Sequence, residues 1–188
     1  MSWKPSSVAN PPNKMRTLIL IPTETEAALL RAACPDAPVR IAGVGMAAAA
    51  AATARIIAEE HPDRLILAGI AGASDRSVAV CEAVAVAGER IAELPGKYAV
   101  RYAADFIPAG LRTVESNTTN RTGVAASGTQ IENMEGAAFL AVCRAFGVPG
   151  AEVRAVSNYT DDPRSAWRIE ESAEKLAKTI IRILPDYE

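Results

Sequence analysis

Acidic and amide side chains follow several predicted strands, where they could act on a bound small molecule. Glu24 and Glu26 follow the apolar run at 17–21, Asn158 follows the predicted strand at 152–157, and Glu135 lies in the first turn of a predicted helix. Ligands of α/β proteins bind beyond the carboxyl ends of the strands. A carboxylate there can accept a proton, and an amide can both donate and accept hydrogen bonds. Glu26 and Glu135 are equally typical of a first helical turn, where the helix dipole favours acids.

These candidates must be positioned by elements that alternate along the chain. Short apolar runs predict strands, and alanine-rich or amphipathic segments predict helices. The predicted strands are 17–21, 39–42, 65–68, 81–87, 111–114 and 152–157, and the predicted helices are 24–33, 46–59, 134–146 and 169–184. The alternation predicts an α/β fold with a mainly parallel sheet and right-handed crossovers. We expect glycines 69 and 72 to close the third strand, and hairpins and loops between residues 95 and 128.

The helix at 134–146 is predicted from the spacing of its apolar residues. They recur at intervals of 3, 4, 7, 8 and 11, which is the stripe of an amphipathic helix. The stripe consists of Met134, Ala137, Ala138, Ala141, Val142 and Ala145.

Composition excludes several classes of function. The 188 residues are 49% hydrophobic with a net charge of -2, and they contain no basic stripe of the kind that nucleic acid binding requires. Cys34, Cys81 and Cys143 form no close pair, which predicts no disulfide and no zinc site and favours a reducing, cytoplasmic setting. The single histidine, His61, precedes a proline in a polar stretch typical of a helix end. Residues 1–14 lack the apolar core of a secretory signal, so we interpret them as a flexible extension before one domain at 15–188.

No metal or cofactor is expected, and no run of residues is apolar enough to cross a membrane. One motif favours a cofactor instead. Gly43-Val-Gly45-Met-Ala-Ala48 fits the dinucleotide-binding pattern G-x-G-x-x-A. The expected acidic residue near position 65 is missing, so a tight turn with close helix–sheet packing is the alternative interpretation.

Several segments, taken together and in order, resemble the purine nucleoside phosphorylase and nucleosidase superfamily. They are LILIPTETEAALL, GVGMAAAAAAT, LILAGIAGA, IENMEGAAFLAVCRAFGVP and EVRAVSNYTDD. The resemblance covers most of the chain from Thr17 to the last helix. It implies a nucleoside-phosphorylase-like fold, with three αβα layers around a central mixed, mainly parallel sheet. It also implies a homo-oligomer.

The resemblance implies a role for each matching residue. Glu26 would act on an attacking water and Arg154 would help to position both. Met134 would pack against a ribose and Glu135 would accept hydrogen bonds from its hydroxyls. Ala71, Gly72 and Asn158 would face the base of a nucleoside substrate.

Asn158 bears on which base is bound. An amide NH₂ can donate to a 6-oxo oxygen while its carbonyl accepts from N7–H, whereas a carboxylate would repel that oxygen. Asn158 therefore favours a 6-oxopurine, hypoxanthine or guanine. Its structural alternative is an Asx turn into residues 159–162.

The turn after the first predicted strand favours hydrolysis over phosphorolysis. A phosphorylase needs a glycine-rich or arginine-bearing anion site. Here Pro22-Thr23-Glu24-Thr25-Glu26 brings carboxylates, which repel phosphate but accept a proton from water. Water is thus the expected nucleophile.

The same resemblance places the 5′ group of the nucleoside near residues 164–168. Trp167 would stack on an aromatic substituent, and Arg164 or Arg168 would pair with a carboxylate on it. A tryptophan that caps the core between solvated arginines is the alternative.

The chain departs from the family pattern at two places. The segment between Glu89 and Ile131 is short and lacks an expected helix, and Gly69-Ile70 carries no hydroxyl. Three alternatives stay open: a phosphorylase, an adenine-type nucleosidase, and a non-catalytic nucleoside-binding or Rossmann-like module.

Overall fold

The computed structural model describes residues 15–123 and 128–187, and the predicted extension at 1–14 lies outside them. The strands are β1 (Thr17–Ile21), β2 (Val39–Ile41), β3 (Arg64–Ala73), β4 (Ala83–Ile91), β5 (Tyr102–Ala103), β6 (Arg112–Thr118), β7 (Ile131–Asn133) and β8 (Gly150–Tyr159). The helices are α1 (Glu24–Ala33), α2 (Met46–Glu60), α3 (Gly136–Phe146) and α4 (Ile169–Ile183), with short 3₁₀ turns at Gly96–Tyr98, Arg164–Ala166 and Leu184–Tyr187.

Within the described residues the strands form one mixed sheet that closes on itself. From the edge, β2, β1 and β3 are parallel neighbours. β3 then pairs with β8 in parallel and with β7 antiparallel. β8 continues to β4, β4 to β6 and β6 to β7, which completes a ring. The expectation of an α/β fold is confirmed, but the sheet curls into a barrel-like form where parallel crossovers alone predict an open sheet.

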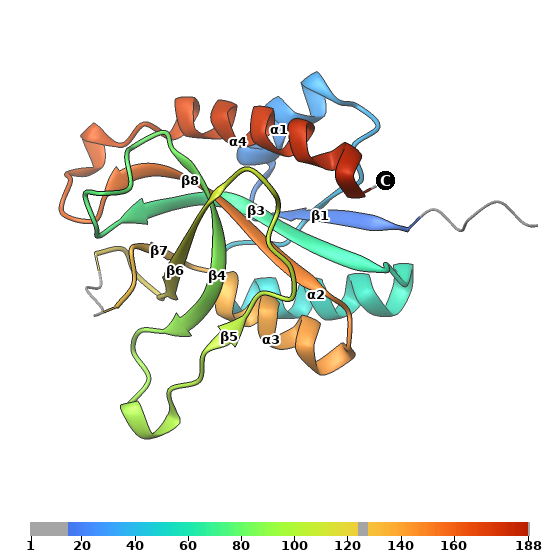
Figure 1. The fold of residues 1–188 in the computed structure, drawn as a ribbon, viewed down its shortest axis with the longest axis horizontal. Helices are drawn as coiled ribbons and strands as arrows, with labels where there is room; N and C mark the ends of the chain where they lie inside the picture. Colours follow the sequence, from blue (N-terminus) through green and yellow to red (C-terminus); the bar gives the residue numbers. More distant parts are fainter. Residues whose placement is uncertain (1–14, 124–127, 188) are drawn as a thin grey trace, which may run out of the picture.

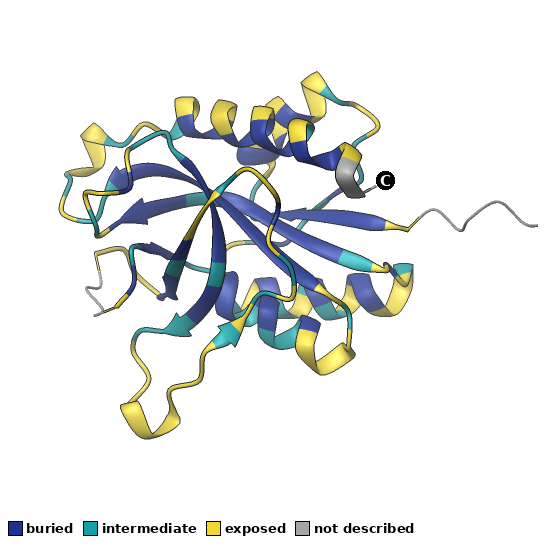
Figure 2. Ribbon diagram, in the orientation of Figure 1, coloured by how far each residue is buried: buried dark blue, intermediate teal, exposed yellow. Residues whose placement is uncertain are grey.

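The helices lie on two sides of this sheet. Figure 1 shows α1 and α4 above the strands and α2 and α3 below them. The strands are the most deeply buried elements, and the outer faces of the helices are exposed (Figure 2). In α4, Ala173, Leu176, Ile180 and Ile183 are buried against the sheet, because they recur at helical spacing.

Two glycines were expected to end the third strand, and this prediction is wrong. β3 continues through Gly69 and Gly72 to Ala73, with a bulge between Ala71 and Gly72. Hydrogen bonding to β8 on one side and β7 on the other compensates for the weak strand propensity of glycine. β7 itself is a three-residue strand that the sequence pattern does not predict.

The third helix begins later than predicted, and its predicted stripe is confirmed only in part, because Ala137 is buried whereas Ala138, Ala141 and Val142 are half-buried. α3 starts at Gly136, so Met134 and Glu135 lie in the junction between β7 and the helix. The buried face carries Phe139, Leu140 and Cys143, whereas Ala145 is exposed. The larger apolar side chains decide which face is buried, because alanine gains little from burial.

The remaining predicted strands are present, but their bounds differ: β4 and β6 end at Ile91 and Thr118, beyond the predicted 87 and 114, and β8 extends to Tyr159 and so contains Asn158. His61 ends α2 as its C-cap, in the left-handed conformation with φ of 47°. In the described parts of 92–130 the structure has a 3₁₀ turn and two strands but no α-helix, and the connection between β4 and β5 projects from the body (Figure 1).

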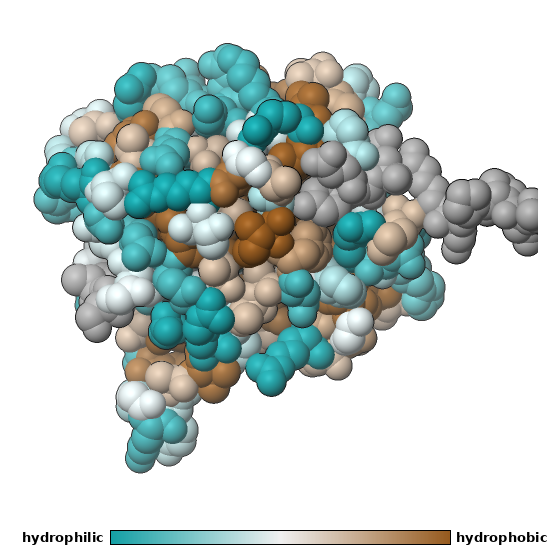
Figure 3. Space-filling model, in the orientation of Figure 1, coloured by the Kyte–Doolittle hydropathy of each residue, from teal (hydrophilic) through white to brown (hydrophobic). Residues whose placement is uncertain are grey.

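Hydrophilic side chains cover most of the face in Figure 3, with hydrophobic ones in small groups. Among the described residues, no helix has the length and apolar character needed to cross a membrane.

Candidate active site

A pocket of about 240 Å³ opens where β3, β7 and β8 meet the loops after β1 and β8. It gathers residues that are far apart in the sequence, as expected where strand ends converge. Of the residues predicted from the sequence, it is lined by Glu26, Ala71, Gly72, Met134, Glu135, Arg154, Asn158, Arg164 and Trp167. Arg168 is not among the lining residues, because its guanidinium pairs with Glu171 on the exposed start of α4.

Glu26 is fixed at the wall of this pocket. Thr23 caps α1 and accepts a hydrogen bond from the Glu26 amide, so the acid sits three residues into the helix. Its carboxylate accepts from the Thr23 hydroxyl at 2.9 Å and from the Ile70 amide in β3 at 3.0 Å. An ordinary capping box would turn this acid back toward the backbone amide of the cap residue. Here Glu26 instead bridges to the sheet, with only 8% of its surface exposed.

Burial sets the protonation behaviour of Glu26. Desolvation raises the pKa of its carboxyl above the usual value of 4.5, and the donors from Ile70 and Thr23 and the charge of Arg154 oppose that rise. A base that protonates closer to neutrality gains a stronger affinity for the proton it must accept. Glu26 therefore has the environment of a general base.

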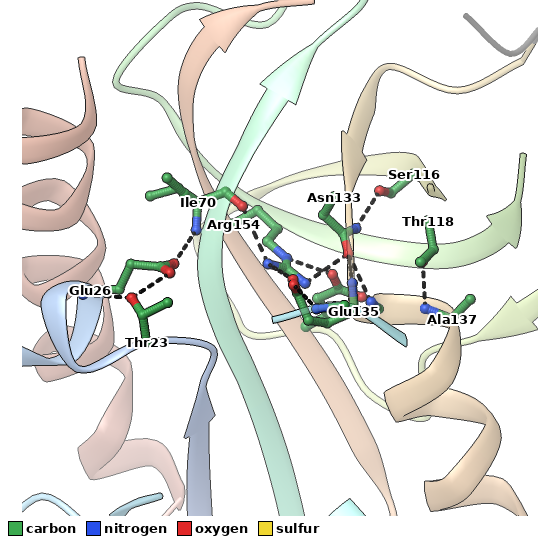
Figure 4. Close-up of polar contacts among 12 residues, drawn as sticks. Thr23, Glu26, Ile70, Ser116, Thr118, Asn133, Glu135, Ala137 and Arg154 are labelled. Carbon is green, nitrogen blue, oxygen red and sulfur yellow. Dashed lines mark hydrogen bonds and ion pairs between the residues drawn. The ribbon is translucent and has the colours of Figure 1, made fainter. Parts of the chain in front are cut away.

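Gly69 lets Glu26 and Arg154 approach each other. A Cβ at Gly69 would lie 2.5 Å from Arg154 Nη1 and 3.2 Å from Glu26 Oε2. Ile70 joins the same two side chains, since its amide donates to Glu26 and its carbonyl accepts from Arg154 at 3.3 Å. Figure 4 shows Glu26 and Arg154 reaching the Ile70 peptide from opposite sides.

Arg154 is a completely buried cation held by three strands. Its guanidinium donates to Glu152 at 2.7 Å, to Asn133 at 2.9 Å and to Glu135 at 3.2 Å. Buried charges are tolerated only when they are paired and hydrogen-bonded, and all three nitrogens of Arg154 have partners here. With the Ile70 carbonyl as the fourth acceptor, four of its five N–H groups are used within the protein, so its main effect is to position Glu135 and the wall beside Glu26.

Glu135 links the glycine-rich turn to this network. The Gly45 amide donates to Glu135 Oε1 at 3.0 Å, while Arg154 binds Oε2. A Cβ at Gly43 would lie 2.8 Å from that of Ala48, so the turn packs tightly on α2. The structural interpretation of the G-x-G-x-x-A motif is thus supported, because the Gly45 amide of the turn donates to the Glu135 carboxylate rather than to a dinucleotide phosphate.

A pair of buried acids lies beneath this arrangement. A Cβ at Gly136 would lie 2.5 Å from Glu89 Oε1 and 2.6 Å from Glu152 Oε2. Among the described residues, Glu152 Oε2 is a buried oxygen with no donor other than a proton on Glu89. Burial and the charge of Glu152 raise the pKa of Glu89 well above the usual range. Of the two acids, Glu89 is therefore the one more strongly favoured to hold a proton.

Asn158 lies on the opposite wall in a fixed orientation. Its Nδ2 donates to the Tyr159 carbonyl at 2.8 Å, and its Oδ1 accepts from the Ser157 hydroxyl at 2.8 Å. The flipped amide would bring two carbonyl oxygens together, so the orientation follows from the network. Ala71 and Gly72 line the same part of the pocket. An Asx turn would require the Thr160 amide to donate to the Asn158 side chain. That amide instead donates to the Ala73 carbonyl at 2.9 Å, so the Asx-turn alternative is wrong.

Arg164 and Trp167 form the outer end of the pocket. The Arg164 guanidinium stacks over the indole at 4.1 Å, and the indole N–H points to the Asp162 carbonyl at 3.4 Å. The tryptophan is half-buried and lines the pocket, so it is not a core residue.

Sequence reasoning missed several residues of the site. Thr23, Asn133 and Ser157 orient the predicted residues, and Glu132 lines the pocket itself. For Glu132 a signal existed, because in Ile131-Glu-Asn-Met-Glu135 the alternation of a strand places residues 132 and 134 on one face. No cluster of three or more potential metal ligands occurs among the described residues.

Comparison with known proteins identifies the class of this fold. A model of the phosphorylase superfamily matches residues 111–187. A solved futalosine hydrolase mutant from Helicobacter pylori superposes with a TM-score of 0.82 at 14% identity, covering 92% of this chain and 99% of that one. A 5′-methylthioadenosine/S-adenosylhomocysteine nucleosidase from Neisseria meningitidis gives 0.80 at 21% identity, covering 92% and 100%. The structure thus has the fold of the phosphorylase superfamily.

A curated relative makes the assignment narrower. The futalosine hydrolase of Thermus thermophilus is 32% identical over 178 residues, which cover 77% of this chain and 79% of that protein. The chain belongs to the futalosine hydrolase family within the phosphorylase superfamily.

Proposed function

We propose that this protein is an N-ribosyl hydrolase that cleaves the glycosidic bond of a 6-oxopurine nucleoside, with futalosine as substrate and hypoxanthine and dehypoxanthine futalosine as products. Such a reaction would belong to menaquinone biosynthesis. The observation that carries the proposal is the position of Glu26. It is a buried carboxylate at the wall of a pocket that also contains Glu135, Arg154 and Asn158.

Glu26 would orient and deprotonate the attacking water. Each of its oxygens accepts one hydrogen bond from the protein, from Thr23 and from Ile70, which leaves lone pairs for water. As the bond from C1′ to the base breaks, its electron pair goes to the base, which takes up a proton at N7 from solvent water, and the ribose develops oxocarbenium character. The attacking water adds to C1′ and passes one proton to Glu26. Arg154 would act by holding the Ile70 carbonyl and Glu135 in place.

Glu135 would accept hydrogen bonds from the ribose hydroxyls, with Met134 packed against the sugar. Asn158 would stabilise the departing base, because its NH₂ can donate to O6 while its carbonyl accepts from N7–H. Ala71 and Gly72 would form the wall along the base. Trp167 and Arg164 would bind an aromatic carboxylate at the 5′ end. Arg168 would not contact the substrate directly, because its guanidinium pairs with Glu171 outside the pocket lining.

Two features of the pocket support water over phosphate as nucleophile. The Glu26 carboxylate would repel a dianion beside C1′. The buried cation Arg154 has four of its five N–H groups engaged by Glu152, Asn133, Glu135 and the Ile70 carbonyl. An anion site of the kind a phosphorylase needs would require free donors.

The proposal also covers the layer architecture, the cellular compartment and the assembly of the protein. Helix pairs on two sides of the sheet support the three-layer αβα arrangement (Figure 1). Five of the eight strand pairings among the described residues are parallel, which supports a mainly parallel sheet. The free cysteines are compatible with a reducing cytoplasm, and assembly as a homo-oligomer is proposed from the family resemblance.

Release of free base from futalosine, inosine and 5′-methylthioadenosine tests class, base and 5′ group together. We expect release from futalosine first and from inosine more slowly. Preferred release of adenine from 5′-methylthioadenosine would instead indicate an adenine-type nucleosidase. Binding without release from any nucleoside would indicate a binding module.

A further inference from the structure

Glu132, Gly72 and Asn158 lie in one row across three strands. Gly72 in β3 pairs with Glu132 in β7 and with Asn158 in β8. Residues paired directly across a sheet point to the same face. All three line the pocket. The row therefore brings an acid and an amide to the two sides of a position that has no side chain.

Gly72 keeps the space between them open. A Cβ at this position would lie 3.2 Å from Asn158 Nδ2 and 3.5 Å from Glu132 Cγ. Any larger side chain would fill the gap between the two polar groups. The gap is bounded on one side by the Asn158 amide and on the other by the Glu132 carboxylate.

Both polar groups are held by the backbone. The Gly123 amide donates to Glu132 Oε1 at 2.6 Å, and 4% of Glu132 is exposed. Asn158 is fixed by the Tyr159 carbonyl and the Ser157 hydroxyl. Glu132 is therefore a buried acid with a fixed position in the wall of the pocket.

We propose that Glu132 is a specificity-determining residue that accepts a hydrogen bond from N1–H of a 6-oxopurine, while Asn158 donates to the adjacent O6. This inference rests on the proposed function. A 6-oxopurine displays an acceptor and a donor side by side at O6 and N1. An amide NH₂ followed by a carboxylate is the complementary pair.

The carboxylate also rejects the wrong base. A 6-aminopurine presents a lone pair at N1 and a donor at position 6, which would place like groups opposite each other at both contacts. A site that leaves a buried polar group unpaired discriminates more strongly than a difference in size does. Hydrogen bonds to charged groups correspond to roughly 10- to 100-fold in a rate or binding constant.

Glu132→Gln is the sharpest variant. Its carbonyl can still accept from the Gly123 amide, whereas the other oxygen becomes an NH₂ donor. We expect kcat/KM for futalosine to fall by roughly 10- to 100-fold. The rate for its 6-amino counterpart should stay level or rise, because the new donor suits the lone pair at N1.

Glu93→Gln is the matched control. Glu93 accepts from Thr119 and Asn120 in the same neighbourhood but does not line the pocket. Its ratio of 6-oxo to 6-amino rates should equal that of the wild type. An equal fall of both rates in Glu132→Gln, with the ratio unchanged, would mean that Glu132 only supports the loop at Gly123 and would overturn the proposal.

Binding of free bases decides the inference independently of catalysis. The wild type should bind hypoxanthine roughly 10-fold or more tightly than 1-methylhypoxanthine, which lacks N1–H. Glu132→Ala, which makes room for the methyl group, should bind the two alike. If the wild type releases no base from any nucleoside, the proposed hydrolase function fails, yet this comparison still tests Glu132. Equal binding of both bases by the wild type would refute its role.

Discussion

Arg154 Nη1 lies 3.2 Å from Glu135 Oε2, and both side chains are almost completely buried. The pair joins β8 to the start of α3 at the floor of the pocket. Removing one partner of a buried ion pair leaves the other charge without compensation. The same contact therefore stabilises the fold and positions the carboxylate proposed to bind ribose.

Arg154→Met should lower the free energy of unfolding by about 3–5 kcal/mol, because it leaves Glu152 and Glu135 without a cation. Urea unfolding followed by circular dichroism measures the change. Arg55→Met is the control, since Arg55 makes an exposed pair with Glu59 on α2 and should change stability far less. Similar stabilities for the two variants would argue against a central role for the Arg154 network.

Glu26→Gln should reduce kcat for base release by about 10²- to 10⁴-fold, because the amide cannot accept the proton of water. The KM should change much less. Glu24→Gln is the matched control two residues away, where the acid is exposed and pairs with Arg31. A Glu26→Gln enzyme with wild-type kcat would remove Glu26 from the mechanism.

The pH profile tests the same residue by a different route. Burial raises the pKa of Glu26, and only the ionised form can act as a base. The rate of the wild type should therefore fall as the pH decreases through that raised pKa, with the midpoint above 4.5. A midpoint below the ordinary carboxyl value would contradict the assignment.

The Glu89–Glu152 pair predicts how stability depends on pH. The pKa of Glu89 is raised in the folded state, so its contribution to stability is present at low pH and is lost as the pH rises through that pKa. Glu152→Gln supplies an NH₂ donor and removes the like charge, which lowers the pKa of Glu89. Unfolding free energies measured from acid to neutral pH should then decline less in the variant, by about 1.4 kcal/mol for each unit of pKa difference. Parallel profiles of unfolding free energy against pH for the wild type and Glu152→Gln would rule out a proton held between Glu89 and Glu152.

Trp167→Ala tests the outer end of the pocket. Trp167 lines the pocket under the Arg164 guanidinium, so its loss should reduce kcat/KM for futalosine more than for inosine, which lacks an aromatic 5′ substituent. Steady-state assays with both nucleosides give the ratio. An unchanged ratio would return Trp167 to a purely structural role.

The sequence pattern predicts the regular elements best where local signals are strong. α1 matches its predicted bounds because Thr23 caps it, and β1 matches because its five residues are all apolar or β-branched and buried. β7 escapes prediction because three residues gain strand geometry only from their neighbours β3 and β6. Closure of the strands into a ring could not be predicted from the sequence either, since it depends on antiparallel pairing between residues far apart in the chain.

The residues of the candidate site could likewise be predicted only in part. Glu26 and Glu135 follow β1 and β7, whereas Asn158 lies near the end of β8, and their positions could be inferred from the strand-end rule together with the family resemblance. The network beneath them could not, because Arg154, Asn133 and Glu152 meet only through the register of β7 and β8 with β3. Arg168 shows the limit of proximity in sequence, because one residue after Trp167 its side chain already points to Glu171.

Release of hypoxanthine from futalosine, measured with and without phosphate, distinguishes water from phosphate as the nucleophile. Water as the nucleophile requires that the rate in phosphate-free buffer equal the rate in phosphate, and that the sugar product be the free ribose derivative. A rate that depends strictly on phosphate, with a ribose 1-phosphate derivative as product, would contradict hydrolysis by Glu26.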